Sequence, residues 1–381
     1  MRGRGAAHLL LGALLAITAL AGCTQSRSAA TQSWSGVAVD GASVFVGTRE
    51  GRLIQLASAT GAPGVAPYEA PAASRNEASH AFYGTPTVAG GRVLVGGYQG
   101  VVYSLDAATL GGALTYEIPA TGLTKGVAGS VVAAGDALVI AATEDANQGR
   151  LYVLEAATLT ERCRYPAAGE APKGQLWTTP VVVDGVAYFG GLGHELHAVN
   201  LTDCSSPWPA PTGLDGAIVA PPLALDGVLY LGAFDRTFYA VDAATGAAQP
   251  LFEGEGWFWA QAATDGQRVF APNLDGHLYA YDLASGRLAW TYPAKGKGDP
   301  IVAAPVVVDG QVVFASDSEV LNVLDAATGA LQWDRKLTAK VRAPLTAAGS
   351  VVYIHALDET VSAVDLATKR LVWDRNLSDV K

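Results

Sequence analysis

A pair of turns that recurs eight times constrains this chain more than any other feature of its sequence. The unit is clearest in residues 306–333, where three β-branched runs are separated by an Asp-Gly turn, an acidic turn and an Asp-Ala-Ala-Thr-Gly turn. Trp333 then opens a fourth run. Short apolar runs between turn residues are typical of antiparallel β-strands. We therefore expect each unit to be a meander of four strands, named A, B, C and D.

Both tight turns can be followed through the whole chain. The A–B turn glycine recurs at Gly41, Gly91, Gly135, Gly185, Gly227, Gly266, Gly310 and Gly349. The C–D turn begins at Ala57, Asp106, Glu155, Asn200, Asp242, Asp282, Asp325 and Asp365. Four strands repeated every 40–50 residues or so are the signature of propeller blades, which stack because one blade cannot bury both of its faces. The sequence predicts an all-β, eight-bladed β-propeller of four-stranded antiparallel blades over residues 34–381, closed by packing between complete blades.

The end of the unit resembles a known repeat. The pattern Asp-Ala-Ala-Thr-Gly-x-Leu-x-Trp of residues 325–333 is similar to the tryptophan-docking motif of the PQQ-like (pyrroloquinoline-quinone-type) β-propeller family, and Trp290 and Trp373 stand at the same offset. That family includes quinoprotein dehydrogenases and a lipoprotein subunit of the bacterial outer-membrane β-barrel assembly machinery. The resemblance implies the fold, whereas function has to be argued from sites on the fold.

Residues 1–22 are predicted to be a lipoprotein signal peptide. Arg2 and Arg4 give a basic start, a short apolar stretch follows, and Leu-Ala-Gly-Cys at residues 20–23 resembles the bacterial lipobox. The resemblance implies lipid chains on Cys23, with residues 23–33 as a lipidated tether to the cell membrane or to the periplasmic face of the outer membrane. An ordinary secretory peptide with a chance cysteine is the alternative.

Two further cysteines, Cys163 and Cys204, remain in a compartment that should be oxidising. Cys163 occupies the tryptophan position of the third D strand, and Cys204 lies in the C–D turn of the next blade. A disulfide between neighbouring blades is one interpretation, and two buried thiols are the other.

Charge and motifs exclude several functions. The formal charge of −10 argues against nucleic acid as a partner. His194 and His197 are three residues apart on an expected strand and point to opposite faces, and the Asp-x-Asn-x-Gly run from Asp145 resembles only the start of a calcium loop. No adjacent cysteine pair, such as quinoprotein dehydrogenases carry against the cofactor, occurs in the sequence. We therefore expect no catalytic residues, no metal and no cofactor.

The two faces of the predicted disc differ. The A–B and C–D turns share one face, called the turn face, and are uniformly tight, so this face is expected to offer little to a partner. The D–A and B–C connections share the other face, called the loop face, where binding residues usually lie. The candidate partner-binding residues there are the aromatic anchors Trp34, Tyr83, Trp177, Trp257 and Trp259 and the rim acids Asp235 and Asp275. Alternatively, these aromatics pack between blades and the acids are solvated turn residues.

These features favour a monomeric, non-enzymatic, lipid-anchored scaffold of the cell envelope. It is expected to bind a basic or mixed-charge segment of another protein or a peptide, similar to the assembly lipoprotein of the family. A PQQ-dependent oxidoreductase is one alternative function, and a propeller that binds carbohydrate or another small ligand is a second.

Overall fold

The computed structural model of the protein describes residues 35–71, 80–119, 125–167 and 172–381. The predicted signal peptide, Cys23, the tether and Trp34 lie outside the described residues. Residues Ser33–Lys381 form a single unit by their internal contacts. Within the described parts of the chain, no helix is long and apolar enough to cross a membrane.

The strands form eight four-stranded antiparallel sheets, each built from four consecutive strands. The A strands are β1 (Val37–Asp40), β5 (Thr87–Ala89), β9 (Val132–Ala134), β13 (Val181–Val183), β17 (Leu223–Leu225), β21 (Ala263–Thr264), β25 (Val306–Val308) and β29 (Thr346–Ala348). The B strands are β2 (Ser43–Gly47), β6 (Arg92–Gly96), β10 (Ala137–Asp145), β14 (Val186–Phe189), β18 (Val228–Gly232), β22 (Arg268–Pro272), β26 (Gln311–Ala315) and β30 (Val351–His355).

The outer half of each blade follows the same order. The C strands are β3 (Arg52–Ala57), β7 (Val101–Asp106), β11 (Gln148–Glu155), β15 (Glu195–Asn200), β19 (Thr237–Asp242), β23 (Leu278–Asp282), β27 (Val320–Asp325) and β31 (Thr360–Asp365). The D strands are β4 (Tyr68–Glu69), β8 (Leu114–Glu117), β12 (Glu161–Tyr165), β16 (Thr212–Gly213), β20 (Ala248–Glu253), β24 (Arg287–Tyr292), β28 (Leu331–Lys336) and β32 (Arg370–Asn376), and a short 3₁₀ helix, η2 (Leu377–Asp379), follows.

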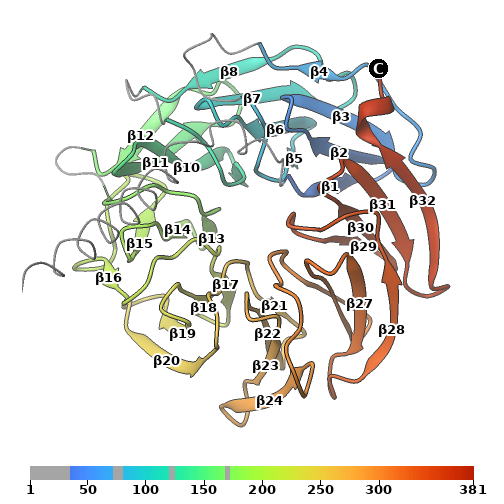
Figure 1. The fold of residues 1–381 in the computed structure, drawn as a ribbon. Coiled ribbons are helices and arrows are strands. Elements are labelled where there is room, and N and C mark those ends of the chain that lie inside the picture. The colour runs from blue at the N-terminus through green and yellow to red at the C-terminus, as the bar shows by residue number, and fades with distance from the viewer. Residues whose placement is uncertain (1–34, 72–79, 120–124, 168–171) are drawn as a thin grey trace, which may run out of the picture. The chain divides into compact units, whose positions relative to one another are not determined.

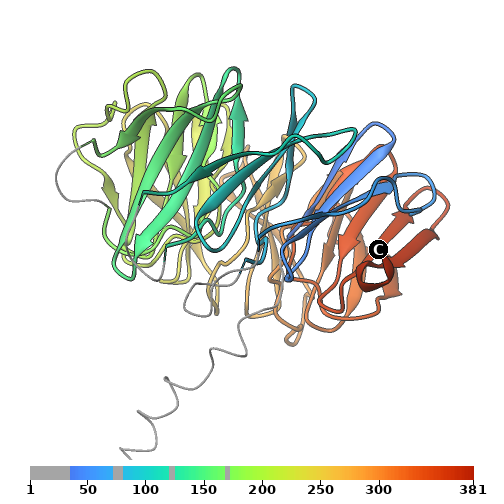
Figure 2. The same cartoon turned by 90° about the horizontal axis from the view of Figure 1, so that it is seen from above.

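The sheets stand around a ring as the blades of a propeller (Figure 1), and the view turned by 90° shows the strands of each blade running between its two faces (Figure 2). The prediction of an eight-bladed β-propeller is confirmed. The A–B turn of the seventh blade shows why the turns were readable: Asp309 and Gly310 have φ of 47° and 74°. A two-residue hairpin turn of type I′ requires positive φ at both central positions, which Asp-Gly tolerates.

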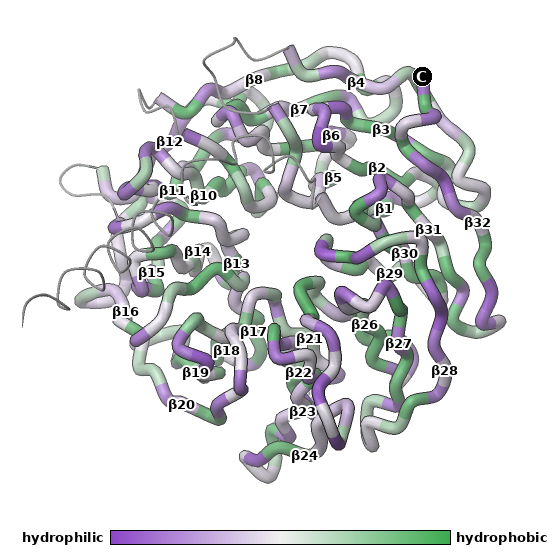
Figure 3. The backbone as a smooth tube through the Cα atoms, in the orientation of Figure 1, coloured by the Kyte–Doolittle hydropathy of each residue, from purple (hydrophilic) through white to green (hydrophobic). Residues whose placement is uncertain are grey.

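The core lies between neighbouring blades. Strands B and C are the most buried, and one cluster joins Val313 and Leu321 of the seventh blade to Val352 and Ile354 of the eighth. Figure 3 shows the hydrophobic residues along these inner strands, with more hydrophilic residues in the turns and along outer strands such as β32. Each blade therefore buries its faces against the blades on either side.

Tryptophans fasten three of the blade junctions in the same way. A tryptophan in or near the D strand of one blade donates a hydrogen bond from its indole Nε1 to a backbone carbonyl in the next blade. The acceptor is the second residue of that blade's C–D turn. The pairs are Trp208 with the Ala243 carbonyl (3.0 Å), Trp290 with the Ala326 carbonyl (3.2 Å) and Trp373 with the Ser58 carbonyl (2.8 Å). We call this arrangement the tryptophan dock. Trp208 was not singled out in the sequence, although it stands eight residues after Asn200, as Trp373 does after Asp365.

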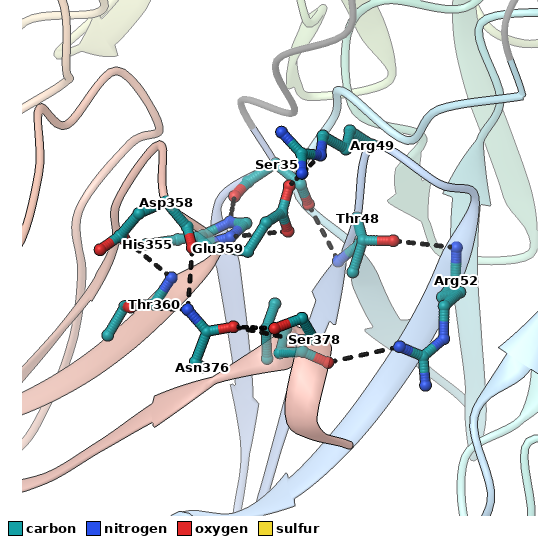
Figure 4. Close-up of polar contacts among 12 residues, drawn as sticks. Ser35, Thr48, Arg49, Arg52, His355, Asp358, Glu359, Thr360, Asn376 and Ser378 are labelled. Atoms are coloured by element: carbon teal, nitrogen blue, oxygen red, sulfur yellow. Dashed lines mark hydrogen bonds and ion pairs between the residues drawn. The ribbon is translucent and has the colours of Figure 1, made fainter. Parts of the chain in front are cut away.

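The ring closes between the eighth blade and a first blade that already has four strands of its own, as predicted. Trp373 docks across this junction, and Arg52 donates to the carbonyls of Leu377 and Val380, which hold η2 against the first blade. Figure 4 shows Arg52 at this junction together with Ser35, whose carbonyl accepts a hydrogen bond from His355 Nδ1 at 2.8 Å. Closure therefore combines apolar packing with polar contacts from both ends of the described chain.

A buried polar group completes this junction on the loop face. His355 Nε2 lies 3.4 Å from Glu359 Oε2, and Glu359 Oε1 lies 3.8 Å from Arg49 Nε. Glu359 holds a φ of 63°, a conformation that is uncommon for a non-glycine residue. Arg49 also pairs with Glu50 at 2.7 Å. This cluster could not be predicted from local sequence, because its members come from blades at opposite ends of the chain.

Candidate binding surface

Three aromatic side chains are stacked together on the loop face. Phe234 lies in the B–C turn of the fifth blade, and Trp257 and Trp259 lie in the connection from the fifth blade to the sixth. The Phe234 ring stacks against Trp257 (centroids 4.6 Å apart, planes 10° apart) and against Trp259 (5.5 Å and 22°). Trp257 is 48% exposed, whereas Phe258 between the two tryptophans is buried in the core. We call Phe234, Trp257 and Trp259 the aromatic stack.

Local sequence explains why Trp257 is exposed beside a buried Phe258. In the run Trp257-Phe258-Trp259 successive side chains alternate in direction, so that the central Phe258 packs with Phe238 and Phe252 in the core, while Trp257 is exposed and Trp259 half-buried. Phe234 was not predicted as a site residue. It occupies the second place of the B–C turn before Asp235, where Leu274 stands before Asp275 in the next blade. An aromatic residue at this turn position was the available signal.

The other predicted anchors lie apart from the stack. Tyr83 lies in the connection between the first and second blades and makes an edge contact with Tyr98 at 5.0 Å. Burial, followed by the neighbouring Tyr98, raises the pKa of Tyr83 to about 12. Trp177 lies between the third and fourth blades, is 37% exposed, and donates from Nε1 to Gln175 Oε1 at 2.8 Å. The anchors thus come from three different blade-to-blade connections, and only Trp257 and Trp259 share one group.

The two predicted rim acids hold their own turns. Asp275 accepts hydrogen bonds from the backbone N–H groups of Glu255 and His277, both at 2.8 Å, and from the Tyr279 hydroxyl at 2.7 Å. Its side chain is only 3% exposed, which corrects the expectation that it forms an exposed rim. A short B–C turn draws the carboxylate inward because the turn's N–H groups need an acceptor.

Asp235 repeats this arrangement one blade earlier. It accepts from the Thr237 N–H at 2.9 Å and from the Tyr239 hydroxyl at 2.5 Å. Burial and then the hydrogen bond to Asp235 raise the pKa of Tyr239 to about 12, so the phenol keeps its proton and donates it. Other acids of this face are paired as well: Glu50 with Arg49, and Asp317 with Lys340 and Arg342. Several acids of the loop face are therefore engaged in hydrogen bonds or ion pairs of their own, including both predicted rim acids.

The turn face is less featureless than its sequence indicates. A pocket of about 980 Å³ opens there between the third and fourth blades. Valine and alanine side chains of β9 and β13 line it, with Leu201 from the fourth blade's C–D turn. At its edge Arg162 is held by Asp136 at 2.7 Å and by Glu155. Because the guanidinium is already paired with two carboxylates, the pocket has no free positive charge to recognise an anion.

The described residues do not fit a quinone site or a metal site. They contain no group of three or more His, Cys, Asp or Glu side chains placed to hold a metal ion. Cys163 and Cys204 are bonded to each other across a blade junction, with Cα atoms 5.9 Å apart, and so they are not adjacent residues against a cofactor. Burial lowers the pKa of His197 to about 4, and this imidazole stacks on Phe189 at 5.2 Å inside the core. The two cysteines and His197 are therefore engaged in contacts that hold the fold together.

An eight-bladed ring whose blades dock through tryptophans places the chain among the PQQ-like β-propellers. The family model described as "Outer membrane protein assembly factor BamB" matches residues 12–169, 253–321 and 274–380. The chain belongs to this family.

Individual relatives are distant. The outer membrane protein assembly factor BamB of Moranella endobia (strain PCIT) is 30% identical over 93 residues, which span 23% of this chain and 23% of that relative's length. The crystal structure of BamB from Moraxella catarrhalis superposes with a TM-score of 0.68 at 18% identity, covering 86% of this chain and 92% of that one. A europium-containing methanol dehydrogenase superposes almost as well, with a TM-score of 0.67 at 14% identity over 86% of this chain and 81% of the enzyme. At these identities the superpositions show the fold alone.

Proposed function

We propose that this chain is a lipid-anchored, non-enzymatic scaffold of the cell envelope that binds a protein partner during outer-membrane protein assembly. The observation that carries the proposal is the aromatic stack, in which the exposed Trp257 is backed by the half-buried rings of Phe234 and Trp259, on the loop face of a propeller from the BamB family. Aromatic residues surrounded by polar groups are the usual anchors of protein interfaces. Glu255, two residues before Trp257, is paired with Lys297 at 3.1 Å, which suits a segment of mixed charge better than a purely basic one.

Attachment to a membrane would orient this surface. The chain enters the propeller at Ser35, whose hydroxyl accepts from the N–H of Gly47 at the end of β2, next to His355 at the end of β30. Both strand ends belong to the loop face. A tether that starts at a lipidated Cys23 would therefore join the same face as the aromatic stack. With roughly 3.3–3.6 Å per extended residue, a dozen residues keep that face within about 40 Å of the bilayer.

An oxidoreductase role has less support. The likeness to a methanol dehydrogenase lies in the fold, and the described residues contain no group of three or more His, Cys, Asp or Glu side chains that could hold a metal ion beside a quinone. A scaffold needs only a rigid ring and an exposed surface, both of which are present. We therefore assign the loop face to protein recognition.

The test is a quantitative pull-down from detergent-solubilised envelope with the wild type, a Trp257→Ala/Trp259→Ala variant and a Leu331→Ala control. Leu331 is a comparably exposed apolar residue, 44% accessible, on the outer strand β28. Truncation of an anchor aromatic should cost about 2 kcal/mol of binding, roughly thirtyfold in affinity, while the control should bind like the wild type. All three proteins must show the same far-ultraviolet circular dichroism.

Two outcomes would count against the proposal, and they differ. Enrichment of outer-membrane assembly proteins to the same extent by all three baits would leave the scaffold role in place but would move the site away from the stack. Recovery of no such protein with any folded bait would remove the assembly role itself.

A further inference from the structure

The tryptophan dock relies on a matched pair of positions in adjacent blades. One is the residue eight places after the start of the C–D turn, and the other is the fifth residue of the next blade's turn. Wherever the first is a docked tryptophan, the second is glycine: Trp208 with Gly246, Trp290 with Gly329 and Trp373 with Gly61. A Cβ added at Gly61 or Gly329 would lie 2.5 Å from the indole. The indole therefore requires a residue without a side chain opposite it.

The same two positions are both cysteine at one junction. Cys163 pairs with Val153 of β11 in the register in which Trp333 pairs with Val323 of β27. Cys204 is the fifth residue of the turn that begins at Asn200, and it keeps the positive φ of the glycines, 56°. The two cysteines are bonded to each other. At another junction the pair is aliphatic, with Val65 and Leu110 in one core cluster.

We infer that the Cys163–Cys204 disulfide takes the place of the tryptophan dock, so that the third and fourth blades are fastened by a bond made through thiol–disulfide exchange. The other docks close by packing and a hydrogen bond, neither of which depends on redox conditions. Besides Cys163 and Cys204 the chain contains only Cys23, so no junction between other blades can be closed by a disulfide within a blade pair. The junction between the third and fourth blades is different in this respect. Its closure therefore depends on the oxidising state of the compartment in which the chain folds.

The chemistry calls for a dithiol–disulfide oxidoreductase as a transient partner. A thiolate of this chain attacks the enzyme's disulfide to form a mixed disulfide and releases one enzyme thiol. The thiolate of the second cysteine then attacks the sulfur of the first cysteine in the mixed disulfide, which forms the Cys163–Cys204 bond, breaks the bond to the enzyme and releases the second enzyme thiol. Two protons and two electrons leave the chain, and the enzyme's disulfide is reduced to a dithiol. Cys204 is only 6% exposed in the closed ring, so the exchange has to occur before this junction packs.

The position of this junction links it to both faces. On the turn face, the 980 Å³ pocket lies between the same two blades and is lined by Leu201 and Arg162, which are close in sequence to the two cysteines. On the loop face, the connection between these blades carries Trp177. A junction without its fastening would therefore loosen the pocket walls and one predicted anchor together.

The experiment exchanges one fastening for the other. The wild type is compared with Cys163→Ser/Cys204→Ser, which removes the fastening, and with Cys163→Trp/Cys204→Gly, which installs a tryptophan dock. Cys163→Val/Cys204→Leu copies the aliphatic junction and serves if the tryptophan variant does not fold. Each protein is unfolded in urea with and without a thiol reductant, and free thiols are counted by alkylation of the denatured, unreduced sample.

The wild type should show no free thiol at 163 or 204. The reductant should lower its folding equilibrium constant by roughly a thousandfold, as the loop-closure relation gives for a bridge that spans 41 residues. The exchanged variant should be more stable than the serine pair and indifferent to reductant. Cys163→Trp alone should be less stable than the exchanged pair, because the Cβ at 204 would occupy the place of the indole. An exchanged pair no more stable than the serine pair would overturn the inference, and so would full thiol labelling of the unreduced wild type.

Discussion

Replacing Trp290 and Trp333 separately with phenylalanine would separate the hydrogen bond of the tryptophan dock from its packing. Both side chains are half-buried at the same position of D strands β24 and β28, and both pack against core clusters shared with the following blade. Trp290 Nε1 donates to the Ala326 carbonyl at 3.2 Å. Trp333 Nε1 is buried and has no hydrogen-bond partner among the described residues; here the fifth turn residue of the next blade is Lys369 rather than glycine.

The expected magnitudes follow from that difference. A net hydrogen bond contributes about 1 kcal/mol to the free energy of unfolding, and the smaller ring gives up about as much again in buried area. Trp290→Phe should therefore lower the free energy of unfolding by about 2 kcal/mol. At position 333 the same loss of area is offset because a buried N–H without a partner disappears, which relieves a penalty on the order of 1 kcal/mol. Trp333→Phe should consequently change stability by less than about 1 kcal/mol.

Urea unfolding monitored by far-ultraviolet circular dichroism measures both changes without relying on tryptophan fluorescence. Trp373→Phe is the matched third variant, because Trp373 donates to the Ser58 carbonyl at 2.8 Å and should behave like Trp290. Equal losses at all three positions would show that the indole hydrogen bond does not distinguish the docks. The reasoning from the Trp333 geometry would then be refuted.

Two further predictions concern the core and the ring closure. Burial lowers the pKa of His197 from 6.5 to about 4, so the unfolded chain takes up a proton between those pH values that the folded chain does not. The free energy of unfolding should therefore fall by up to about 3 kcal/mol as the pH drops through this window. His197→Phe should remove this part of the acid sensitivity, measured by urea titrations at pH 7 and pH 4.5. An unchanged pH dependence in the variant would contradict a lowered pKa of His197. Gly61→Ala should destabilise the closed ring by about 2 kcal/mol more than Gly41→Ala in the same assay, because both glycines have positive φ but only Gly61 faces an indole, 2.5 Å away; equal effects would show that the dock is not tightly packed.

Several features of the fold followed from local sequence. Blade number, strand order and the position of each turn were predicted because a hairpin turn needs particular residues at positive φ, and because short apolar runs between turns indicate strands wherever they occur. The pairing partner of each strand is its neighbour in sequence, so little long-range information was needed. The offset that places Trp290 and Trp373 also places Trp208, which the repeat therefore contained although it was not singled out.

The candidate surface depended more on contacts between blades. The sequence indicated exposed aromatics at Trp257 and Trp259, but the Phe234 ring between them comes from the preceding blade, some twenty residues earlier in the chain. From its residue type and its place in a turn, Asp275 could equally well be a solvated acid. Only the folded structure shows that N–H groups and the Tyr279 hydroxyl enclose its carboxylate. Whether an acid faces solvent or its own turn is decided by donors that become neighbours on folding.

The sequence by itself determined the repeating unit, because each blade's turns and strands depend on residues within the same stretch of about 40–50 positions. Only the tertiary structure decided what stands opposite each position in the next blade: glycine against Trp373, a second cysteine against Cys163, and Arg49 against Glu359 at the closing junction. The physical reason is that blade junctions are filled by side chains from two units. Their volumes and charges have to match each other, and neither unit alone specifies its partner.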